Sequence, residues 1–255
     1  MKNYISGEYF AVTDIGKVRS CNEDFADKRI NSYGNILLVV CDGMGGANKG
    51  DYASFTLGKH ICDSFMDANK EFKKPAKATK WLYNVINEIN RDIYKKATEE
   101  RQYEGMGTTL TAALLFDKYC VIAQVGDSRL YRLNSDNKLE QMTVDQTYVH
   151  FLSNNKRISE EEIKTHPDRH KLTNAIGVHP NANVDMTFFE YKGERLLLCS
   201  DGLYNNVSHN DIQAILRGNE SPERKCLQLI AFGNANGGSD NMAVVIWEND
   251  NGPRA

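Results

Sequence analysis

The chain has 255 residues, of which 41% are hydrophobic and 25% charged, and these ordinary globular values exclude collagen, coiled coils and wholesale disorder. With 31 Lys and Arg against 34 Asp and Glu, the net charge of −3 argues against a constitutive nucleic-acid binder. No apolar run approaches the 18 residues that a membrane span needs, and the first residues lack the apolar core of a secretory signal. We therefore expect a cytoplasmic protein with no membrane and no nucleic-acid partner.

Two strands and two helices are expected in the first hundred residues. Residues 36–40 form a continuous apolar run, which is typical of a buried strand. Between Ala78 and Ile93 the apolar residues recur close to a 3.6-residue period, which predicts an amphipathic helix. The expected strands cover residues 9–15 and 35–42, and the expected helices cover 49–67 and 76–100.

Strands dominate the middle of the chain, and helices return near its end. Asp117 and Lys118 form a two-residue link between strand-like segments, which predicts a hairpin. Ser159 and Glu162 have capping-box spacing within a polar stretch that lacks clear periodicity. Strands are expected over 109–116, 119–126, 129–133, 184–190, 194–200 and 242–247, with helices beginning at Ser208 and Ser221 and a frayed tail over 248–255. This order favours a layered α+β domain over a parallel βαβ array.

The six cysteines show no CxxC pair, and Cys41, Cys120 and Cys199 lie inside apolar, strand-like segments. Buried free thiols in a reducing compartment are therefore the expected state of the cysteines.

Acidic residues stand where the predicted strands end. If these strands pack together, several like charges meet in one place, which is unfavourable unless the carboxyl groups are protonated or bind cations. Hard oxygen ligands of this kind suit Mg²⁺ or Mn²⁺ rather than Zn²⁺, which favours Cys and His. The acids concerned are Glu23, Asp24, Asp42, Asp127, Asp201 and Asp240.

Seven short motifs, five of which contain these acids, follow one another along the chain. They are RxxNED at 19–24, DGMGG at 42–46, GTT at 107–109, GDSR at 126–129, NAIG at 174–177, SDGL at 200–203 and SDN at 239–241. This arrangement resembles the metal-dependent protein phosphatase family, type 2C, over residues 15–245. It most resembles the compact bacterial members, so we expect residues 1–255 to form a single catalytic domain.

The resemblance implies an α+β fold, a four-layer αββα sandwich in which two central antiparallel sheets are flanked by helix pairs. A two-metal cleft would lie at one end of the sandwich. The polar stretch over about 145–174 matches the mobile flap that lies beside this cleft in the family.

The resemblance also assigns metal ligands and a phosphate-binding residue. Asp42 would bridge two ions, either Mn²⁺ or Mg²⁺, and Arg19 would grip the phosphate. The other ligands would be Asp201 and Asp240 at one ion, Glu23 and the Gly43 carbonyl at the other, and Asp127 with Asp201 at a possible third ion.

The expected reaction is the hydrolysis of phosphoserine and phosphothreonine in proteins. A metal-bridging hydroxide would attack phosphorus in line, with no phospho-enzyme intermediate. The partners would be phosphorylated substrates of a Ser/Thr kinase, and the phosphatase would be a monomer. Met44 stands where the eukaryotic members that this chain resembles have a histidine proposed to protonate the leaving group, and many bacterial members have Met there. Since a thioether cannot donate a proton, we expect water on the metal to do so.

Two other classes of protein fit part of this pattern. A pseudophosphatase would bind phosphoproteins without hydrolysing them, but here every ligand position that the resemblance assigns to a side chain is acidic. A two-metal hydrolase of another phosphoester would carry the same acids and would differ in the shape of its cleft. Arg19 could also serve only in a salt bridge. His166 and His170 lie outside the motifs, and Pro167 breaks the helix that would align them, so no metal role is expected for either.

Overall fold

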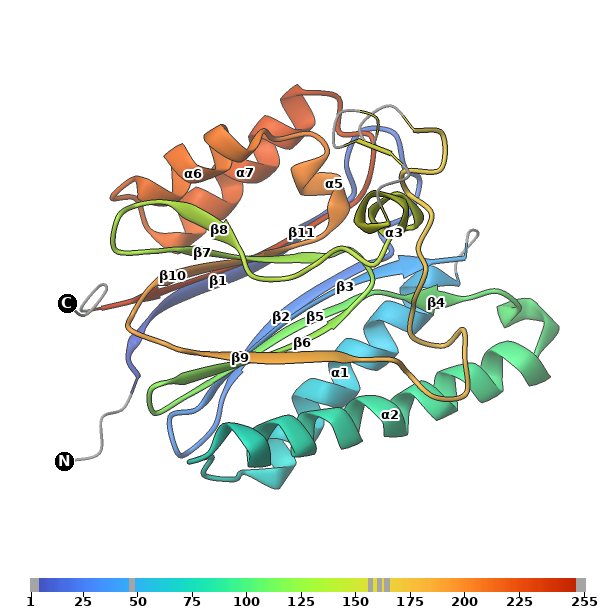
Figure 1. The fold of residues 1–255 in the computed structure, drawn as a ribbon, viewed down its shortest axis with the longest axis horizontal. Helices are drawn as coiled ribbons and strands as arrows, with labels where there is room; N and C mark the ends of the chain where they lie inside the picture. Colours follow the sequence, from blue (N-terminus) through green and yellow to red (C-terminus); the bar gives the residue numbers. More distant parts are fainter. Residues whose placement is uncertain (1–4, 46–48, 156–157, 160–161, 163–165, 251–255) are drawn as a thin grey trace.

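Two antiparallel sheets form the centre of the molecule in the computed structural model, which describes residues 5–45, 49–155, 158–159, 162 and 166–250 (Figure 1). The first sheet has the order β1 (Gly7–Asp14), β11 (Met242–Asn249), β10 (Arg195–Cys199), β7 (Arg129–Leu133) and β8 (Leu139–Gln141). The second has the order β2 (Asp24–Ile30), β3 (Ile36–Met44), β5 (Leu110–Phe116), β6 (Tyr119–Val125) and β9 (Asp185–Glu190), with the short β4 (Gly107–Thr108) beside β3.

Helices cover the outer face of each sheet (Figure 1). The second sheet is covered by α1 (Gly50–Ala68) and α2 (Pro75–Glu99), and a 3₁₀ turn, η1 (Arg101–Tyr103), leads from α2 to β4. The first sheet is covered by α6 (His209–Arg217) and α7 (Pro222–Ala235). Two shorter helices, α3 (Tyr148–Asn154) and α5 (Asp201–Tyr204), lie at the end of the sandwich where β3 ends. No helix among the described residues is long and apolar enough to cross a membrane.

The alternation of side chains along the strands builds three apolar layers. In β3, Leu37 and Val39 point toward α1 and α2, whereas Leu38 and Val40 fill the space between the sheets. In β11, Val244 packs toward α6 and α7. The three layers together make the αββα sandwich that the sequence predicts, and the α+β class is confirmed.

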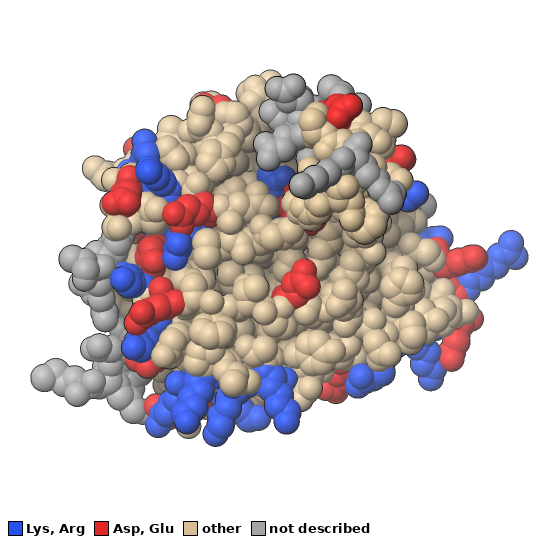
Figure 2. Space-filling view, in the orientation of Figure 1, with Lys and Arg blue, Asp and Glu red and all other residues tan. Residues whose placement is uncertain are grey.

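Basic side chains gather over the beginning of α2 (Figure 2), where residues 70–80 contain five lysines. The other end of α2 leads through η1 to β4, which pairs with the end of β3. The beginning of α2 therefore lies in a basic surface, whereas its end lies near β4 and borders the site described below.

Some elements depart from the sequence prediction. Strand β2 was not expected because its apolar residues are few, and as an edge strand of the second sheet it is only half-buried. Strand β11 continues to Asn249 rather than fraying from residue 248, because the Glu248 carboxylate accepts a hydrogen bond from the fully buried Lys225. Residues 251–255 of the expected frayed tail lie outside the described residues.

The predicted local motifs form as expected. The link at Asp117 and Lys118 joins β5 to β6, and Asp117 adopts the left-handed φ of 49° that such a turn requires. The backbone N–H of Ser159 donates to the Glu162 carboxylate, and the N–H of Glu162 donates to the Ser159 hydroxyl. Most of the helix that this capping box would begin lies outside the described residues. All six cysteines are free thiols, and five of them are buried.

Candidate active site

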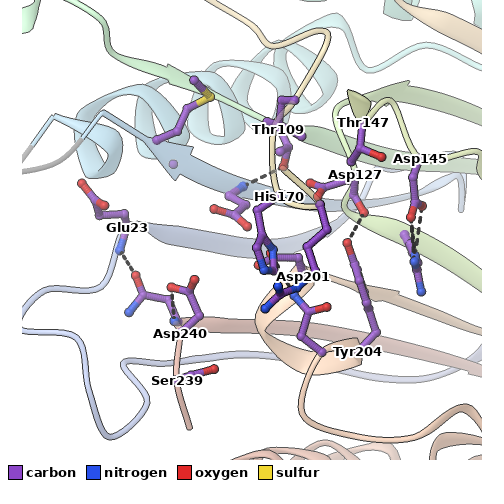
Figure 3. Close-up of a pocket in the computed structure, with 18 of the residues that line it drawn as sticks. Glu23, Thr109, Asp127, Asp145, Thr147, His170, Asp201, Tyr204, Ser239 and Asp240 are labelled. Carbon is purple, nitrogen blue, oxygen red and sulfur yellow. Dashed lines mark hydrogen bonds and ion pairs between the residues drawn. The ribbon is translucent and has the colours of Figure 1, made fainter. Parts of the chain in front are cut away.

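A cavity of about 1140 Å³ opens at the end of the sandwich where β3 and β10 stop. Every residue to which the sequence analysis gives a site role lines this cavity. They are Arg19, Glu23, Asp42, Gly43, Asp127, Asp201 and Asp240. Figure 3 shows Glu23 and Asp240 on one side of it, Asp127 on the other, and Asp201 between them.

The β2–β3 pair brings the first acids together. Asp24 and Asp42 are directly opposite each other in the register of the two strands. The backbone N–H of Asp42 donates to the Thr109 hydroxyl at 3.0 Å, which fixes the end of β3. Glu23, just before β2, uses its backbone carbonyl to accept a hydrogen bond from the N–H of Gly43 at 3.0 Å.

Gly43 and Gly50 allow the backbone to close tightly around Glu23. A Cβ atom on Gly43 would lie 2.2 Å from the Gly50 carbonyl oxygen, so no larger residue fits there. The N–H of Gly50, at the first residue of α1, donates to the Glu23 carboxylate at 3.0 Å. This close contact holds the Glu23 side chain beside the Gly43 carbonyl, the pair that the resemblance assigns to one ion.

The other sheet supplies Asp201 and Asp240. Asp201 is the first residue of α5, directly after β10, and Asp240 lies two residues before β11. The Arg19 guanidinium donates to the Asp240 carboxylate at 2.7 Å. The side-chain amide of Asn205 donates to the Asp201 carboxylate at 3.1 Å, one turn along the chain.

Burial in the cleft and the neighbouring carboxylates make ionisation unfavourable for several acids. Desolvation, reinforced by Asp24 and Asp201, raises the pKa of Asp42 well above its usual value. Burial raises the pKa of Asp24 to about 8, even though the Ser200 hydroxyl donates to its carboxylate at 2.6 Å. The pKa of Asp127 also rises to about 8, through burial and then the charge of Asp201. A cation in the cleft would relieve this repulsion.

The donor set fits Mg²⁺ or Mn²⁺. Each predicted ligand offers a carboxylate or carbonyl oxygen, the donors that these hard ions prefer. Within the described part of the chain, no three side chains of His, Cys, Asp or Glu are grouped closely enough to hold a metal ion by themselves. Asp240 instead faces Arg19, and Asp201 faces Asn205.

A hydrogen-bonded layer lies under the Asp127 side of the cavity. The hydroxyls of Thr109 and Ser128 share a hydrogen bond of 2.7 Å, and the Tyr204 hydroxyl donates to the Asp127 backbone carbonyl at 3.1 Å. The Tyr204 ring also lies 3.5 Å from the Arg129 guanidinium. Ser128 is thus bound to Thr109 rather than placed beside a base, which argues against its acting as a nucleophile.

Described residues of the stretch predicted as a flap line this cavity, and the stretch is tied down at its base. The N–H of Gly126 donates to the Gln146 side chain at 2.8 Å, and the side chain of Asn174 donates to the same oxygen at 2.8 Å. One glutamine therefore joins both ends of the 145–174 stretch to the end of β6.

His170 is a cavity residue that the sequence motifs did not reveal. Its Nδ1 lies 3.7 Å from the Asp201 carboxylate, and interaction with Asp201 raises the pKa of His170. The position depends on the path of the flap across the cleft, for which the sequence has no local signal. Asp24 was noted among the strand-end acids but received no role, although it lies opposite Asp42.

Comparisons with known proteins agree with this site. A family model described as protein phosphatase 2C matches residues 16–223. The serine/threonine phosphatase stp of Listeria monocytogenes is 36% identical over 239 residues, which cover 93% of this chain and 94% of that protein. The chain belongs to the protein phosphatase 2C family, and it is a serine/threonine protein phosphatase.

Solved structures share the fold over almost the whole chain. The serine/threonine phosphatase of S. agalactiae matches with a TM-score of 0.90 and 30% identity, covering 96% of this chain and all of that one. The catalytic domain of the phosphatase PstP, solved in complex with two manganese ions, matches with a TM-score of 0.82 and 32% identity over 94% of this chain and 96% of that one. Family membership and this neighbour support a divalent metal cofactor.

Proposed function

We propose that this chain hydrolyses phosphoserine and phosphothreonine in proteins with two Mn²⁺ or Mg²⁺ ions in the cleft. The observation that carries the proposal is the convergence of carboxylates from both sheets on one cavity, where burial opposes their ionisation. The relatives are named as serine/threonine phosphatases, which supports phosphoproteins as substrates of this chain.

The proposed ligand sets follow the two sheets. Asp42 would contact both ions, Glu23 and the Gly43 carbonyl would complete one site, and Asp201 and Asp240 would complete the other. A third, weaker ion would lie between Asp127 and Asp201, whose charges already interact. Bound ions would supply a water activated as the nucleophile and would offset charge on the phosphate.

Arg19 would bind the phosphate from the open side of the cleft. Its side chain is half exposed, and its guanidinium already reaches Asp240 at 2.7 Å. A guanidinium can grip two phosphate oxygens at once and so hold phosphorus in line for attack by water. Ser128 is bound to Thr109, which argues against a serine nucleophile at this position, and we propose direct attack by water with no phospho-enzyme.

Several finer assignments complete the proposal. Residues 1–255 would act as one catalytic domain, since the apolar layer between the sheets joins strands from both halves of the chain. The free thiols suit a reducing compartment, which supports a cytoplasmic site of action. We further propose a monomer that reverses the work of a Ser/Thr kinase, without nucleic-acid or membrane partners.

Stopped-flow kinetics test the reaction itself. A phosphothreonine peptide and p-nitrophenyl phosphate should both release phosphate with Mn²⁺ and not with EDTA. Release of p-nitrophenol should begin without a burst, because no phospho-enzyme accumulates. A burst equal to the enzyme concentration would show a covalent intermediate, and metal-independent release would refute the proposed metal chemistry.

A further inference from the structure

A second cavity, of about 540 Å³, opens beside the active-site cleft, between the end of α2, η1 and the loop at Gly177 and Val178. Its exposed apolar lining comes from Val178, which is 41% exposed at the surface, and from the partly exposed Tyr94. Glu99, Arg101 and Glu104 also line it. An exposed aliphatic side chain in a concave site is available to bind another apolar group.

The short strand β4 lies between the cleft and this cavity. Met44, which lines the cleft, pairs with Gly107 across the β3–β4 ladder. A Cβ atom on Gly107 would lie 3.5 Å from Met44 Cγ and 3.2 Å from Val178 Cγ2. Met44 and Val178 therefore flank the same point of β4, where the Ile176 carbonyl oxygen also lies 2.9 Å from the place of a Gly107 Cβ atom.

Two neighbouring glycines, Gly45 and Gly105, add no side chains between the cleft and the cavity. A Cβ atom on Gly45 would lie 3.0 Å from the Cα of Met106, so the cleft wall directly contacts the cavity wall. Gly105, with a φ of 78°, has no atom within 4 Å of the place where a Cβ would stand. Gly45 and Gly105 are exposed, whereas Met106 and Gly107 are buried, so a polypeptide that leaves the cleft toward the cavity would pass Gly45 and Gly105.

The length of this path follows from strand geometry. Met44 is two residues beyond Asp42 in β3, which is about 7 Å along a strand. Gly107 is opposite Met44 on the adjacent strand, about 5 Å away. Gly107 is therefore roughly 8 to 12 Å from Asp42 between backbone positions, and Val178 of the cavity lies beside Gly107. This span corresponds to three to four residues of an extended peptide at about 3.3 Å each.

Building on the proposed phosphatase function, we propose that this cavity binds an aliphatic side chain of the protein substrate, three or four residues from the phosphorylated residue. Burial of such a side chain against Val178 and the partly exposed Tyr94 removes apolar surface of both partners from water. The cavity would thus select among phosphorylated sequences, while the acids of the cleft act on the phosphate that all of them share.

Matched phosphothreonine peptides test the proposal. Each pair is identical except for leucine or glycine at one position, and the pairs scan positions two to five residues to either side of the phosphothreonine. We expect kcat/KM to be about tenfold higher for the leucine peptide than for the glycine peptide when the varied position is three or four residues from the phosphothreonine on one side. Partial burial of a leucine side chain contributes a free energy of this size. The substitution Val178→Asp should reduce the ratio of kcat/KM for the leucine peptide to kcat/KM for the glycine peptide to about one.

A matched variant distinguishes the loss of binding in the cavity from the general effect of adding a charge to the surface. Leu227, 50% exposed on α7 in the opposite helix layer, lies outside both cavities, so Leu227→Asp should keep the tenfold ratio. If Val178→Asp lowers the melting temperature, the milder Val178→Ser takes its place, with the same expected loss of preference. The ratio is measured within each variant, so a change in overall activity does not affect it.

Two results would overturn this proposal. One is a wild-type enzyme that shows no preference at any scanned position, and the other is a preference that survives both substitutions of Val178. Failure of the proposed phosphatase function would look different, because wild-type enzyme with Mn²⁺ would then not hydrolyse p-nitrophenyl phosphate, which has no peptide to occupy the cavity.

Discussion

The side-chain oxygen of Asn241 accepts a hydrogen bond from the backbone N–H of Glu23 at 2.9 Å, across 218 positions of sequence. The amide group of the same side chain donates to the carbonyls of Ile15 and Cys21, both at 2.9 Å. Asn241 immediately follows Asp240 and precedes β11. One buried amide therefore fixes the acids of the two sheets relative to each other.

Replacing this amide should loosen the site without removing any proposed ligand. Asn241→Ala deletes three hydrogen bonds and leaves buried backbone groups near Glu23 without partners. We expect a loss of about 2 to 3 kcal/mol in the free energy of unfolding and at least about tenfold weaker Mn²⁺ binding. Chemical denaturation and isothermal titration calorimetry measure the two effects.

Asn236→Ala is the matched control for this substitution. The Asn236 side chain donates one hydrogen bond, to the Asn206 carbonyl at 2.7 Å, in an exposed setting, and it does not line the cavity. Its removal should leave Mn²⁺ affinity unchanged. Equal affinities of wild type and Asn241→Ala would contradict the role given to Asn241.

The raised pKa values of Asp24 and Asp127 make the metal-free protein sensitive to pH. Both carboxyl groups have a pKa of about 8 in the folded chain, above the ordinary value of 3.8 that they regain on unfolding. Between these values the folded state holds protons that the unfolded state has released, so stability falls as pH rises. The melting temperature in EDTA should drop by roughly 5 °C or more between pH 5.5 and 8.

Manganese should reverse this trend, because the ion stabilises the ionised carboxylates and competes with protons for them. The increase in melting temperature on adding Mn²⁺ should therefore be larger at pH 8 than at pH 5.5. Calorimetry at pH 7 in buffers of different ionisation enthalpy should also detect proton release on binding. A metal-free melting temperature that rises steadily over this range would contradict the assigned pKa shifts.

The ion pair at the base of the flap should matter for stability. The Arg129 guanidinium donates to the Asp145 carboxylate at 2.6 Å, and both side chains are largely buried, with 22% and 16% exposed. Arg129→Met leaves the Asp145 charge without its partner. We expect a loss of about 2 to 3 kcal/mol in the free energy of unfolding, measured by urea denaturation.

An exposed ion pair provides the comparison. Lys59 and Asp63 pair one turn apart on α1, and about half of each side chain is exposed. Lys59→Met should change the free energy of unfolding by less than about 0.5 kcal/mol. If Arg129→Met cost no more than this, the buried pair would not be a structural support of the flap.

Local sequence patterns predicted most of the strands and helices and the α+β class, whereas the four-layer sandwich and its cleft were implied by the family resemblance. A buried apolar run that ends in an acid, as at residues 36–42, predicts a strand and places the acid at the end of that strand. The same local signal located Asp127 and Asp201. All these residues line one cavity because antiparallel strands of both sheets end on the same side.

Other features depend on contacts that the sequence does not encode locally. Strand β2 has a weak apolar pattern, so the pairing that brings Asp24 opposite Asp42 could not be predicted from periodicity. His170 reaches Asp201 only through the path of the flap. Helix α3 is seven residues long and begins with Thr147 as its cap, too short for a helical period to stand out.

The central claim is that carboxylates from both sheets jointly hold the ions that hydrolyse the phosphoester. Phosphate release from a phosphothreonine peptide in Mn²⁺ tests it most directly, with wild type, Asp240→Ala and the control Asp136→Ala, whose carboxylate lies in an exposed turn. We predict that EDTA and Asp240→Ala each reduce release by at least about 100-fold, while Asp136→Ala has no effect. Near wild-type release by a folded Asp240→Ala variant would contradict the account.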